Sequence, residues 1–431
     1  MRFQTLPQWL DWQENLHFTE VDPGLERVGA VWENLAGSKK LPYTIVTVAG
    51  TNGKGSSVAI LESILRAAGY RTGTYTSPHI LRYNERICIN NIPCDDKIIC
   101  DAFNRIDHAR NQVSLTYFEF ATLAAVDIFQ QHNIDIAILE VGMGGRLDAV
   151  NLFDTDIALI TPISLDHTNW LGTTREKIGI EKAGVIRTNK PVVCSEQKPP
   201  QSVLTFAASL ASPVYLAETD YFSTLNKDTW RWQNNHVCFD NLPMPALMGL
   251  YQIQNAAAVI QVILLLTDLD YSISTNNIKL GLRTVELSGR FQQIPGDVEQ
   301  ILDVTHNQQG AENLAKLLKD TPYKGRTIAV LGMLKDKDVI AVVSTLHTAI
   351  DQWYVGGLAG GRGLTGEQLA EKVISVVGED HVKTFMATDD AHRHAMKDTK
   401  KGDRILVFGS FHTVESALRI NNEQLSGDTN E

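Results

Sequence analysis

The chain has few cysteines, and none of them stand in a CxxC pair. An odd and sparse set of cysteines is typical of reduced thiols and argues against a disulfide framework. The even spacing of the first three would suit a metal site, but no His or further Cys nearby completes a ligand set, so small buried side chains are the favoured interpretation. The five are Cys88, Cys94, Cys100, Cys194 and Cys238.

Long apolar runs and an excess of positive charge are also absent. No stretch approaches the roughly 18 uninterrupted apolar residues of a membrane-spanning helix. The opening residues MRFQTLPQWLDWQENLHF lack the charged and then apolar segments of a signal peptide, so we expect a soluble, cytoplasmic protein. With 39 Lys and Arg against 50 Asp and Glu, the formal charge is −11, which gives no general attraction to nucleic acid or anionic membrane. Ligand phosphates would depend on local backbone and a few cations.

Short apolar runs rich in β-branched residues alternate with helical patterns along the chain. The earliest runs are TIVTVAG (44–50), IDIAILEVG (134–142) and DTDIALITPIS (154–164). Residues 56–69 follow the first run, place apolar side chains at helical spacing and stop at Gly69. Such alternation is typical of a parallel sheet with helices on both faces, so we predict an α/β fold with a mostly parallel sheet.

Two departures from this alternation divide the 431 residues. Residues 200–250 have the pattern of short strands or hairpins and predict a small β insert, followed by a helix at 255–266. The turn-rich segment LSGRFQQIPGDVEQ marks a boundary, after which the alternation restarts. We predict two domains with a ligand between them. They are a first domain over 1–287, a linker over 288–298 and a Rossmann-like α/β domain over 299–431 with helices at 310–319, 337–349, 365–377 and 412–420.

The segment VTVAGTNGKGSSVAIL joins an apolar run to a helical pattern through a glycine-rich loop. Glycines let backbone N–H groups approach an anion closely, and the start of a helix adds its dipole. Lys54 offers a charge for the β- and γ-phosphates, and Ser56 and Ser57 offer hydroxyls for a phosphate or Mg²⁺. The spacing is not that of the standard P-loop, because Gly55 separates Lys54 from Ser56. A nucleotide phosphate is favoured over a plain tight turn, which makes the first domain a P-loop-type domain.

Six segments of the chain occur in a fixed order. They are GTNGKGSS (50–57), YTSPHILRYNERI (75–87), FEFAT (118–122), LEVGMGGRLDAVN (139–151), LDHTNWLG…IEKAGVIR (165–187) and DVTHN (303–307). Together they resemble the folylpolyglutamate synthase/dihydrofolate synthase family within the Mur ligase superfamily, over most of the chain. The resemblance implies an ATP-dependent amide ligase that adds L-glutamate to dihydropteroate, giving dihydrofolate, and to tetrahydrofolate or folylpolyglutamate through an acyl phosphate.

The charge on a transferred phosphoryl group must be balanced by cations. Glu140 ends the run IDIAILE, and its hard oxygens at a sheet edge suit Mg²⁺, although a carboxylate exposed to water is the alternative. The resemblance implies Ser77, His167 and a carbamylated Lys182 as further metal ligands; an ordinary His and a salt-bridging Lys are the alternatives. The implied catalytic residues are Lys54, Glu140, His167 and Lys182.

The resemblance also implies the residues that contact ATP and the acid substrate. For ATP they are Gly50, Thr51, Asn52, Gly53, Lys54, Gly55, Ser56, Ser57, Asn255, Arg290, Asp303 and His306. For the substrates they are Arg82, Phe118, Asp148, Ser410 and His412. Asp148 would pair with a pterin and Phe118 would stack on it, whereas a loop carboxylate and a core Phe are the alternatives. Ser410 and His412 would seat the incoming glutamate, and Arg290 would reach the γ-phosphate only when the domains close.

The chain departs from the family pattern at Tyr251, where His is usual, and at Gln308, where Pro is usual. Neither position carries a charge needed for transfer, so the departures concern the loop shape and the adenine pocket. Three other functions stay open: polyglutamylation alone, a Mur-type ligase acting on another acid, and a P-loop regulator or dinucleotide-binding protein. The expected cofactors are ATP and Mg²⁺, and the expected partners are small molecules, with no nucleic acid or membrane, around a monomer.

Overall fold

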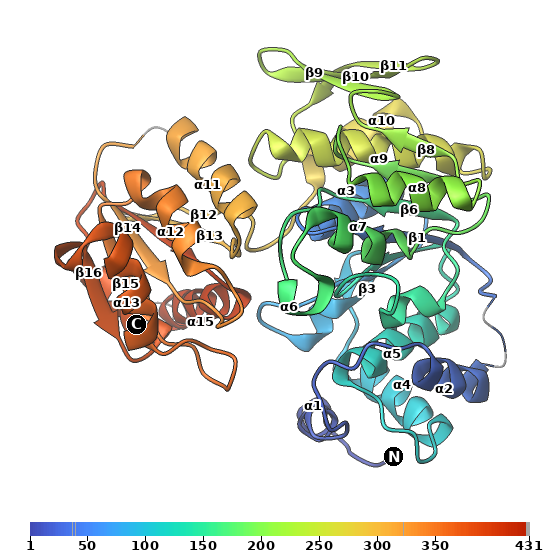
Figure 1. The fold of residues 1–431 in the computed structure, drawn as a ribbon, viewed down its shortest axis with the longest axis horizontal. Helices are drawn as coiled ribbons and strands as arrows, with labels where there is room; N and C mark the ends of the chain where they lie inside the picture. Colours follow the sequence, from blue (N-terminus) through green and yellow to red (C-terminus); the bar gives the residue numbers. More distant parts are fainter. Residues whose placement is uncertain (37, 39, 322, 428–431) are drawn as a thin grey trace. The chain divides into compact units, whose positions relative to one another are not determined.

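The computed structural model describes residues 1–36, 38, 40–321 and 323–427 (Figure 1). It divides into two compact units. The first comprises Met1–His79, Tyr83–Ala246 and Leu250–Glu286. The second comprises Ile80–Arg82, Leu247–Gly249 and the chain from Leu287 onward. Each unit is built around its own sheet.

The sheet of the first unit has eight strands in the order β4-β3-β2-β5-β1-β6-β7-β8. Six of them are parallel, and β3 and β4 form an antiparallel hairpin at one edge. The strands β1, β5 and β6 are buried almost throughout, which fits their continuous apolar sequence. In chain order the strands are β1 (Thr44–Ala49), β2 (Thr72–Tyr75), β3 (Ile87–Ile89), β4 (Ile92–Pro93), β5 (Ile136–Glu140), β6 (Ile157–Ile160), β7 (Val192–Cys194) and β8 (Val214–Leu216).

Helices cover both faces of this sheet, as the alternation predicts. Ile45 and Ala49 of β1 join a core cluster with the helices of one face, whereas Val46 and Val48 point to the opposite face, which α3 and α9 cover. On the first face lie α1 (Leu6–Glu14), α2 (Glu26–Ala36), α4 (Asp96–Ala109), α5 (Tyr117–Gln131), α7 (Arg175–Ala183) and α8 (Gln201–Ser209). On the other lie α3 (Lys54–Ala67), α9 (Tyr251–Thr267) and α10 (Thr275–Thr284). The α/β fold with a mostly parallel sheet is thereby confirmed.

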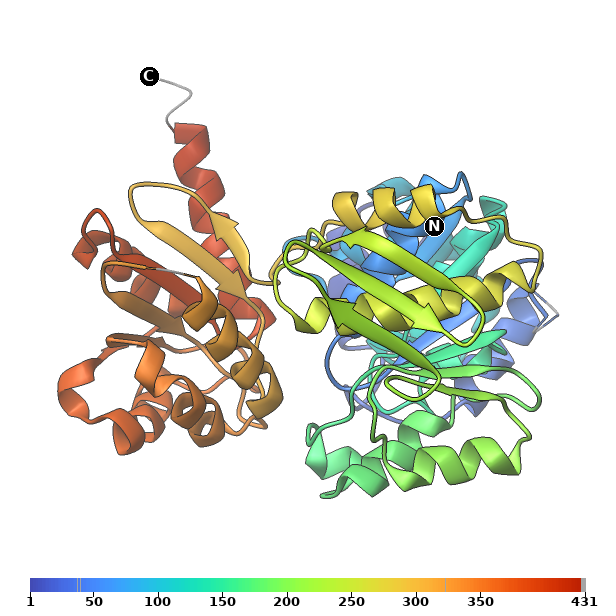
Figure 2. The same cartoon turned by 90° about the horizontal axis from the view of Figure 1, so that it is seen from above.

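The β insert is shorter than the 200–250 that the sequence suggested. The first part of that range continues the βα alternation, because α8 turns Val203 and Ala207 into the core and β8 pairs in parallel with β7. The antiparallel sheet is confined to β9 (Tyr221–Leu225), β10 (Thr229–Asn234) and β11 (Cys238–Pro243). Figure 2 shows these strands beside α9, where the Trp232 indole donates a 2.9 Å hydrogen bond to the Ala257 carbonyl.

The second unit has a six-stranded sheet in the order β12-β13-β17-β14-β15-β16, parallel except for β12. Its strands are β12 (Gln292–Ile294), β13 (Glu299–Asp303), β14 (Thr327–Leu331), β15 (Gln352–Gly356), β16 (Val382–Phe385) and β17 (Arg404–Phe408). Its helices are α11 (Gln308–Asp320), α12 (Val339–Leu346), α13 (Gly366–Val377), α14 (Thr388–Asp398) and α15 (Phe411–Gly427).

The segment 288–298, expected as a linker, is part of the second unit instead. β12 lies within it and pairs antiparallel with β13, and the buried Phe291 anchors its start. The turn residues on both sides of this segment therefore belong to a hairpin and not to a free connection.

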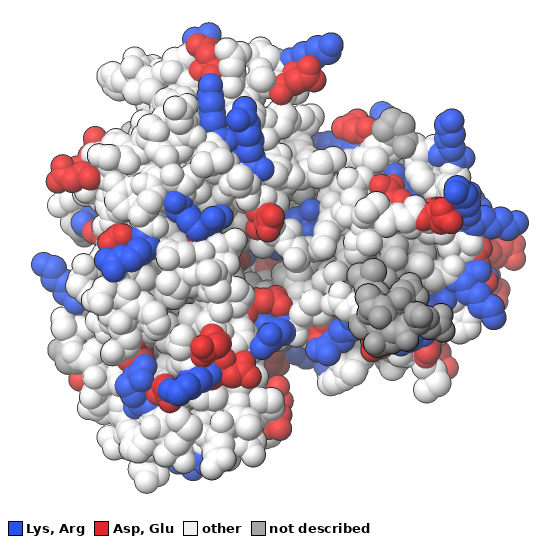
Figure 3. Space-filling model, turned by 180° about the vertical axis from the view of Figure 1, so that it is seen from behind, with Lys and Arg blue, Asp and Glu red and all other residues white. Residues whose placement is uncertain are grey.

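Two surface properties complete the description. Among the residues that the structure describes, no helix is both long and apolar enough to cross a membrane. On the face drawn in Figure 3, lysine and arginine alternate with aspartate and glutamate over short distances. The net charge of −11 is thus not gathered into one acidic area on this face.

Close packing of α10 on α3 gives a testable consequence. A Cβ added to Gly281 would lie 2.6 Å from the Ile64 Cα and 2.7 Å from the Ile64 backbone nitrogen. Because backbone cannot move aside cheaply, Gly281→Ala is expected to lower the free energy of unfolding by about 1–3 kcal/mol. Urea unfolding measures this change.

Gly24→Ala is the matched control, because its Cβ would meet only the end of the Glu26 side chain, at 3.1 Å. We expect its unfolding curve to stay close to that of the unaltered protein. Equal stability of the two variants would contradict the packing of α10 against α3.

Candidate active site

The glycine loop lies between the end of β1 and the start of α3, and its glycines are sterically required. Gly50 has a φ of +143°, and a Cβ there would lie 1.8 Å from the Thr161 Oγ1. Gly53 has a φ of +90° and stands at the N-cap position of α3 without a side-chain cap. The described residues offer no acceptor to the N–H groups of the first helical residues, Lys54 to Ser56. This helix start therefore presents donors to an anion.

The loop is tied to the chain that follows β6. The Thr51 N–H donates to the Pro162 carbonyl at 3.0 Å, and the Thr51 hydroxyl donates to the Ser164 carbonyl at 3.2 Å. The Asn52 side chain donates to the Ser164 hydroxyl at 3.4 Å. Thr51 and Asn52 thus fix the loop with their own polar groups, whatever they also contribute to a ligand.

Two lysines converge on the carbonyl oxygen of Gly50. The Lys182 Nζ on α7 donates to it at 2.7 Å, and the Lys54 Nζ donates to it at 3.2 Å and to the Thr51 carbonyl at 3.2 Å. Burial, together with the smaller effect of the nearby Lys54 charge, lowers the pKa of Lys182 to about 7. A lysine amine that is neutral near pH 7 is a competent nucleophile, which is the property that carbamylation by CO₂ requires.

Ser77 and Glu140, two expected metal ligands, are adjacent. Glu140 is the last residue of β5 and is buried, and β2 is its neighbour in the sheet, with Tyr75 opposite Leu139. The Ser77 N–H donates to the Glu140 Oε2 at 3.3 Å. The parallel register places both at the carboxyl edge, next to the glycine loop that follows β1.

His167 follows β6 at the same edge of the sheet. It starts the short helix α6 (Thr168–Leu171) with a φ of +49° and is half-buried, and its N–H donates to the Asp166 carboxylate at 2.8 Å. The Asp166 charge in turn raises the pKa of Lys182, against the larger effect of burial. Asp166 is therefore an acidic neighbour of the site that the sequence did not single out, although it directly precedes His167.

The oxygen atoms of Glu140 and Ser77 suit a hard cation that is also coordinated by the phosphates of a bound nucleotide. Within the described ranges, no three His, Cys, Asp or Glu side chains form a ready-made metal cluster, the early cysteines included. Mg²⁺ is usually held by one or two carboxylates together with substrate phosphates. Glu140, beside Ser77 and near a phosphate-type loop, fits that kind of site.

Helix α9 contributes polar side chains to the back of the loop. Gly53 approaches Asn255 so closely that a Cβ would lie 2.7 Å from the Asn255 Oδ1. Asn255 donates to the Gln252 Oε1 at 2.9 Å, and Gln252 donates to the Ser56 hydroxyl at 3.3 Å. The Ser57 hydroxyl is buried with no partner among the described residues. Gln252 is a further residue that the sequence did not single out.

Asp148 and Phe118 both approach Gly142 closely. A Cβ at Gly142 would be 2.6 Å from the Phe118 Cζ and 3.3 Å from the Asp148 Oδ2. The Asp148 carboxylate accepts hydrogen bonds from the N–H groups of Met143 at 2.9 Å and Val150 at 3.0 Å, so it also caps a short 3-10 helix. Burial raises the pKa of Asp148 to about 6, against these hydrogen bonds. Phe118 is half-buried, which leaves part of its ring for a ligand.

The other expected residues belong to the second unit. Asp303 ends β13, and its two oxygens accept the N–H groups of Phe291 and Thr305, each at 2.8 Å. The Arg290 guanidinium lies 5.5 Å from the centre of the Phe411 ring. Arg82 is exposed, and the His306 Nδ1 lies 2.9 Å from the Val304 carbonyl.

Ser410 and His412 follow β17, whose Phe408 lies opposite Asp303 in the register. The buried Ser410 hydroxyl accepts the Thr413 N–H at 3.1 Å, and His412 is exposed, 3.7 Å from Glu415. The residues expected at the site thus form two groups. The first unit holds Gly50–Ser57, Ser77, Phe118, Glu140, Asp148, His167, Lys182 and Asn255, and the second holds Arg82, Arg290, Asp303, His306, Ser410 and His412.

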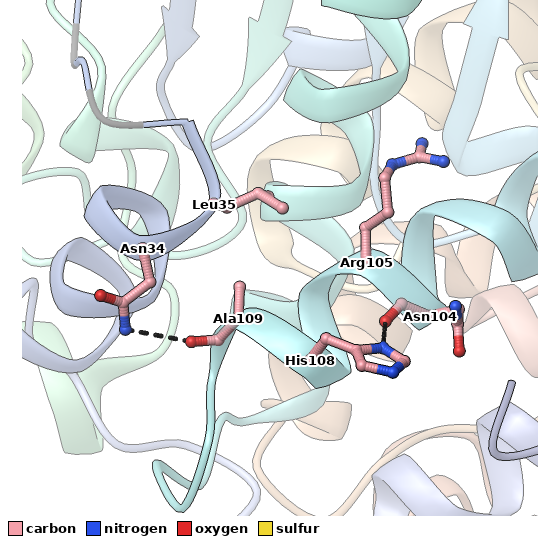
Figure 4. Close-up of a pocket in the computed structure, with 6 residues that line it drawn as sticks. All are labelled: Asn34, Leu35, Asn104, Arg105, His108 and Ala109. Carbon is pink, nitrogen blue, oxygen red and sulfur yellow. Dashed lines mark hydrogen bonds between the residues drawn. The ribbon is translucent and has the colours of Figure 1, made fainter.

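A separate shallow pocket lies between α2 and α4 (Figure 4). It is lined by Asn34, Leu35, Asn104, Arg105, His108 and Ala109. The Asn34 amide donates to the Ala109 carbonyl at 3.0 Å across its floor. None of the residues expected at the active site lines it.

Comparison with known proteins places this geometry in a family. Residues 48–263 match the Mur ligase middle domain, and residues 289–411 match the Mur ligase glutamate ligase domain. The chain is 40% identical to the dihydrofolate synthase/folylpolyglutamate synthase of Escherichia coli (strain K12), over 98% of this chain and 97% of that relative. This chain belongs to the dihydrofolate synthase/folylpolyglutamate synthase family. The resemblance of the six sequence segments is confirmed.

Solved structures of the family agree along the whole chain. The E. coli FolC in complex with DHPP and ADP is 40% identical, with a TM-score of 0.91, and covers 98% of each chain. A bifunctional folylpolyglutamate synthase/dihydrofolate synthase with Mn, AMPPNP and L-glutamate bound is 41% identical, with a TM-score of 0.88, and covers 97% of this chain and 98% of that one. The two positions at which this chain departs from the family pattern, Tyr251 and Gln308, are the first residues of helices α9 and α11.

The buried amine of Lys182 predicts a distinctive pH dependence of stability. Its pKa falls from 10.5 in the unfolded chain to about 7 in the folded protein, so between these values the unfolded chain binds a proton that the folded one lacks. Stability therefore rises with pH in this window, and below it the folded protein carries the whole penalty of a buried charge. Lys182→Met should gain most stability over the unaltered protein at about pH 6, and this gain should shrink toward pH 10.

Urea unfolding in CO₂-free buffer at a series of pH values measures this difference. Lys177→Met removes an exposed lysine from the same helix and is the control. A stability difference for Lys182→Met that did not change with pH would contradict a neutral Lys182.

Proposed function

We propose that this chain is an ATP-dependent amide ligase that joins L-glutamate to dihydropteroate, giving dihydrofolate, and to tetrahydrofolate and folylpolyglutamate. The observation that carries the proposal is the convergence of Lys54 and Lys182 on the Gly50 carbonyl, at the sheet edge where Glu140 lies beside Ser77. Relatives that match the chain from end to end carry this activity in their names, and solved relatives hold ADP, AMPPNP and L-glutamate.

The reaction has two steps that balance. A carboxylate oxygen of the folate substrate attacks the γ-phosphorus of ATP, and ADP leaves. The amine of L-glutamate then attacks the carbonyl carbon and loses a proton, and inorganic phosphate leaves with the oxygen that came from the carboxylate. Direct attack of an amine on a free carboxylate would have to expel an oxide, so the phosphoryl group supplies the leaving group that the reaction lacks.

The residues of the first unit fit the nucleotide end of this reaction. The uncapped start of α3 and the Lys54 ammonium would bind the phosphates, and Asn255 and the Ser57 hydroxyl lie beside the same loop. Glu140 and Ser77 would hold Mg²⁺, with His167 and a carbamylated Lys182 as further ligands, and the ion would neutralise the charge of the phosphates. Asn255, Arg290, Asp303 and His306 complete the proposed ATP contacts.

Phe118 and Asp148 fit the pterin end. The ring of Phe118 offers a flat face, and the Asp148 carboxylate approaches the same side of Gly142 as this ring. Burial raises the Asp148 pKa to about 6, which is still below neutral pH, and its carboxylate oxygens are suited to accept hydrogen bonds from a pterin. Arg82 is proposed to contact the acid substrate, and Ser410 and His412 are proposed to seat the incoming glutamate.

Polyglutamylation without dihydropteroate activity is the second candidate. A relative named folylpolyglutamate synthase, from Lacticaseibacillus casei, is 31% identical over 72% of this chain. ADP release with dihydropteroate and with tetrahydrofolate, each with L-glutamate, separates the two candidates. A bifunctional enzyme releases ADP with both acids, whereas turnover of ATP without either acid would overturn the ligase assignment.

We also propose that the enzyme acts as a monomer in the cytoplasm. All five cysteines are free and four are buried, which fits a reducing compartment, and the substrates ATP and L-glutamate are metabolites of that compartment. Elution of the purified protein as a single 47.7 kDa species supports the monomer, and a larger particle overturns it.

Substitution of Lys54 and of Glu140 tests the roles proposed for these two residues. Lys54→Ala and Glu140→Ala should each lower kcat by about 100-fold to 1,000-fold. The first removes a cation that balances the charge of the transferred phosphoryl group, and the second removes a proposed ligand of the Mg²⁺ ion that does the same. Melting temperatures should change little. Lys177→Ala, which removes an exposed lysine, is the control, and a Lys54 or Glu140 variant with full activity would exclude that residue from the mechanism.

Chemical rescue tests the carbamylated lysine. Lys182→Ala leaves a gap beside the Gly50 carbonyl, and a small carboxylate such as acetate or formate is expected to occupy it and replace the missing ligand. Activity should therefore be low in chloride and should recover in part with added formate. The same salt added to Lys54→Ala should have no effect; equal rescue of both variants would contradict a carboxylate role for Lys182.

A further inference from the structure

Arg86 is a buried arginine that the proposed mechanism does not use. It ends the 3-10 helix Tyr83–Arg86, directly before β3, and only 9% of its surface is exposed. Its carbonyl accepts the Thr76 N–H at 3.0 Å, so its backbone lies beside the residue that precedes Ser77. The residue is thus placed near the sheet edge that carries Glu140.

The nearest neighbours of this guanidinium are aromatic rings and a histidine. The Arg86 Nε donates to the His79 Nδ1 at 2.8 Å, which requires that nitrogen to be unprotonated. The centres of the Tyr83 and Tyr117 rings each lie 5.5 Å from the guanidinium carbon. Among the residues that the structure describes, no carboxylate lies within salt-bridge distance of Arg86, and its two terminal nitrogens have no hydrogen-bond acceptor and are not fully buried.

This arrangement is unusual for a buried arginine. Guanidinium groups that leave water are normally paired with a carboxylate or a phosphate, because an unpaired buried charge is costly. Arg110 shows the ordinary case in this chain: it is 8% exposed, lies 5.0 Å from the Trp12 ring and pairs with Asp107 at 2.9 Å. Arg86 has the aromatic packing of Arg110 without its carboxylate.

A carboxylate bound to Arg86 would lie close to the proposed pterin contacts, Phe118 and Asp148. Tyr75 lies near both Arg86 and the proposed pterin contacts. The centre of its ring is 5.7 Å from that of Phe118. Burial raises the pKa of Tyr75, and the charges of Arg86 and Asp148 act on it in opposite directions, Arg86 lowering it and Asp148 raising it. Tyr75 thus lies close to Phe118, and the Arg86 carbonyl accepts the N–H of the next residue, Thr76. Thr76 in turn precedes Ser77, which contacts Glu140, so Arg86 is a neighbour both of the proposed pterin contacts and of the proposed metal ligands.

We propose that Arg86 binds the carboxylate of the folate-side substrate and holds it in place for activation. The planar guanidinium donates from its terminal nitrogens to the two carboxylate oxygens, while His79 and the two tyrosines fix its orientation. This role rests on the proposed ligase function. It makes Arg86 a binding residue for the acid, distinct from the residues that hold ATP.

The test compares dihydropteroate with its decarboxylated analogue, in which hydrogen replaces the carboxyl group of the same pterin-arylamine. Calorimetric titration without ATP or glutamate gives Kd values for both probes. A charge-assisted pair of this kind predicts that the unaltered protein prefers dihydropteroate on the order of tenfold to a hundredfold, and that Arg86→Gln loses this preference. Arg110→Gln is the matched control and should keep it.

Other outcomes decide against the proposal or its premise. If Arg86→Gln still prefers dihydropteroate over the analogue, the proposed role of Arg86 is wrong. The role is also wrong if Arg86→Gln raises only the KM for L-glutamate. If the unaltered protein binds neither probe, the proposed function itself fails, whatever Arg86 does. If Arg86→Gln does not fold, Arg86→Lys is used in its place. This variant keeps the positive charge but lacks the planar guanidinium with its paired donors, so dihydropteroate should bind several-fold more weakly while the binding of the analogue is unchanged.

Discussion

The carbonyl oxygen of Gly50 is the point on which the proposed site depends. It accepts hydrogen bonds from both Lys54 and Lys182, two residues that are far apart in sequence. The backbone can bring this oxygen there only because Gly50 adopts a φ of +143° against Thr161, where any side chain would collide. A single backbone position thereby couples the phosphate-binding loop after β1 to helix α7.

The parallel sheet supplies the rest of the geometry. Val48 pairs with Glu140 and Tyr75 with Leu139, so the loop after β1, the carboxylate at the end of β5 and Ser77 after β2 reach the same edge. Burial at this edge lowers the pKa of Lys182 and raises that of Asp148, both toward neutrality. The local cations and backbone donors explain how a chain with a net charge of −11 is suited to anionic ligands.

The sequence predicted the features that periodicity and short motifs encode. The apolar runs before Gly50 and up to Glu140 became β1 and β5, and the helix after Gly53 became α3. It did not predict that α8 and β8 continue the alternation of the first unit, because β8 is only three residues long. It also did not predict that β12 is a strand, because the pairing of β12 with β13 decides this.

Among the residues at the site, the ones predicted were those to which the resemblance assigns a role. Asp166 and Arg86 lie within the same segments and Gln252 lies near Asn255, but none of the three was predicted, because the role of each depends on a neighbour that is distant in the sequence. Gln252 on α9 donates a hydrogen bond to Ser56 on the neighbouring helix α3, and the charge of Asp166 raises the pKa of Lys182 through space. The absence of a partner for Arg86 is a property of the folded chain and leaves no mark on the sequence.

Transfer of one carboxylate oxygen to phosphate is the most direct measure of the proposed chemistry. Dihydropteroate labelled with ¹⁸O in its carboxyl group would be turned over with ATP and L-glutamate, and the released inorganic phosphate analysed by mass spectrometry. Activation of the acid by the γ-phosphoryl group predicts one ¹⁸O atom in the phosphate for each amide bond formed. Phosphate that carries no label, with dihydrofolate still being made, would contradict the account.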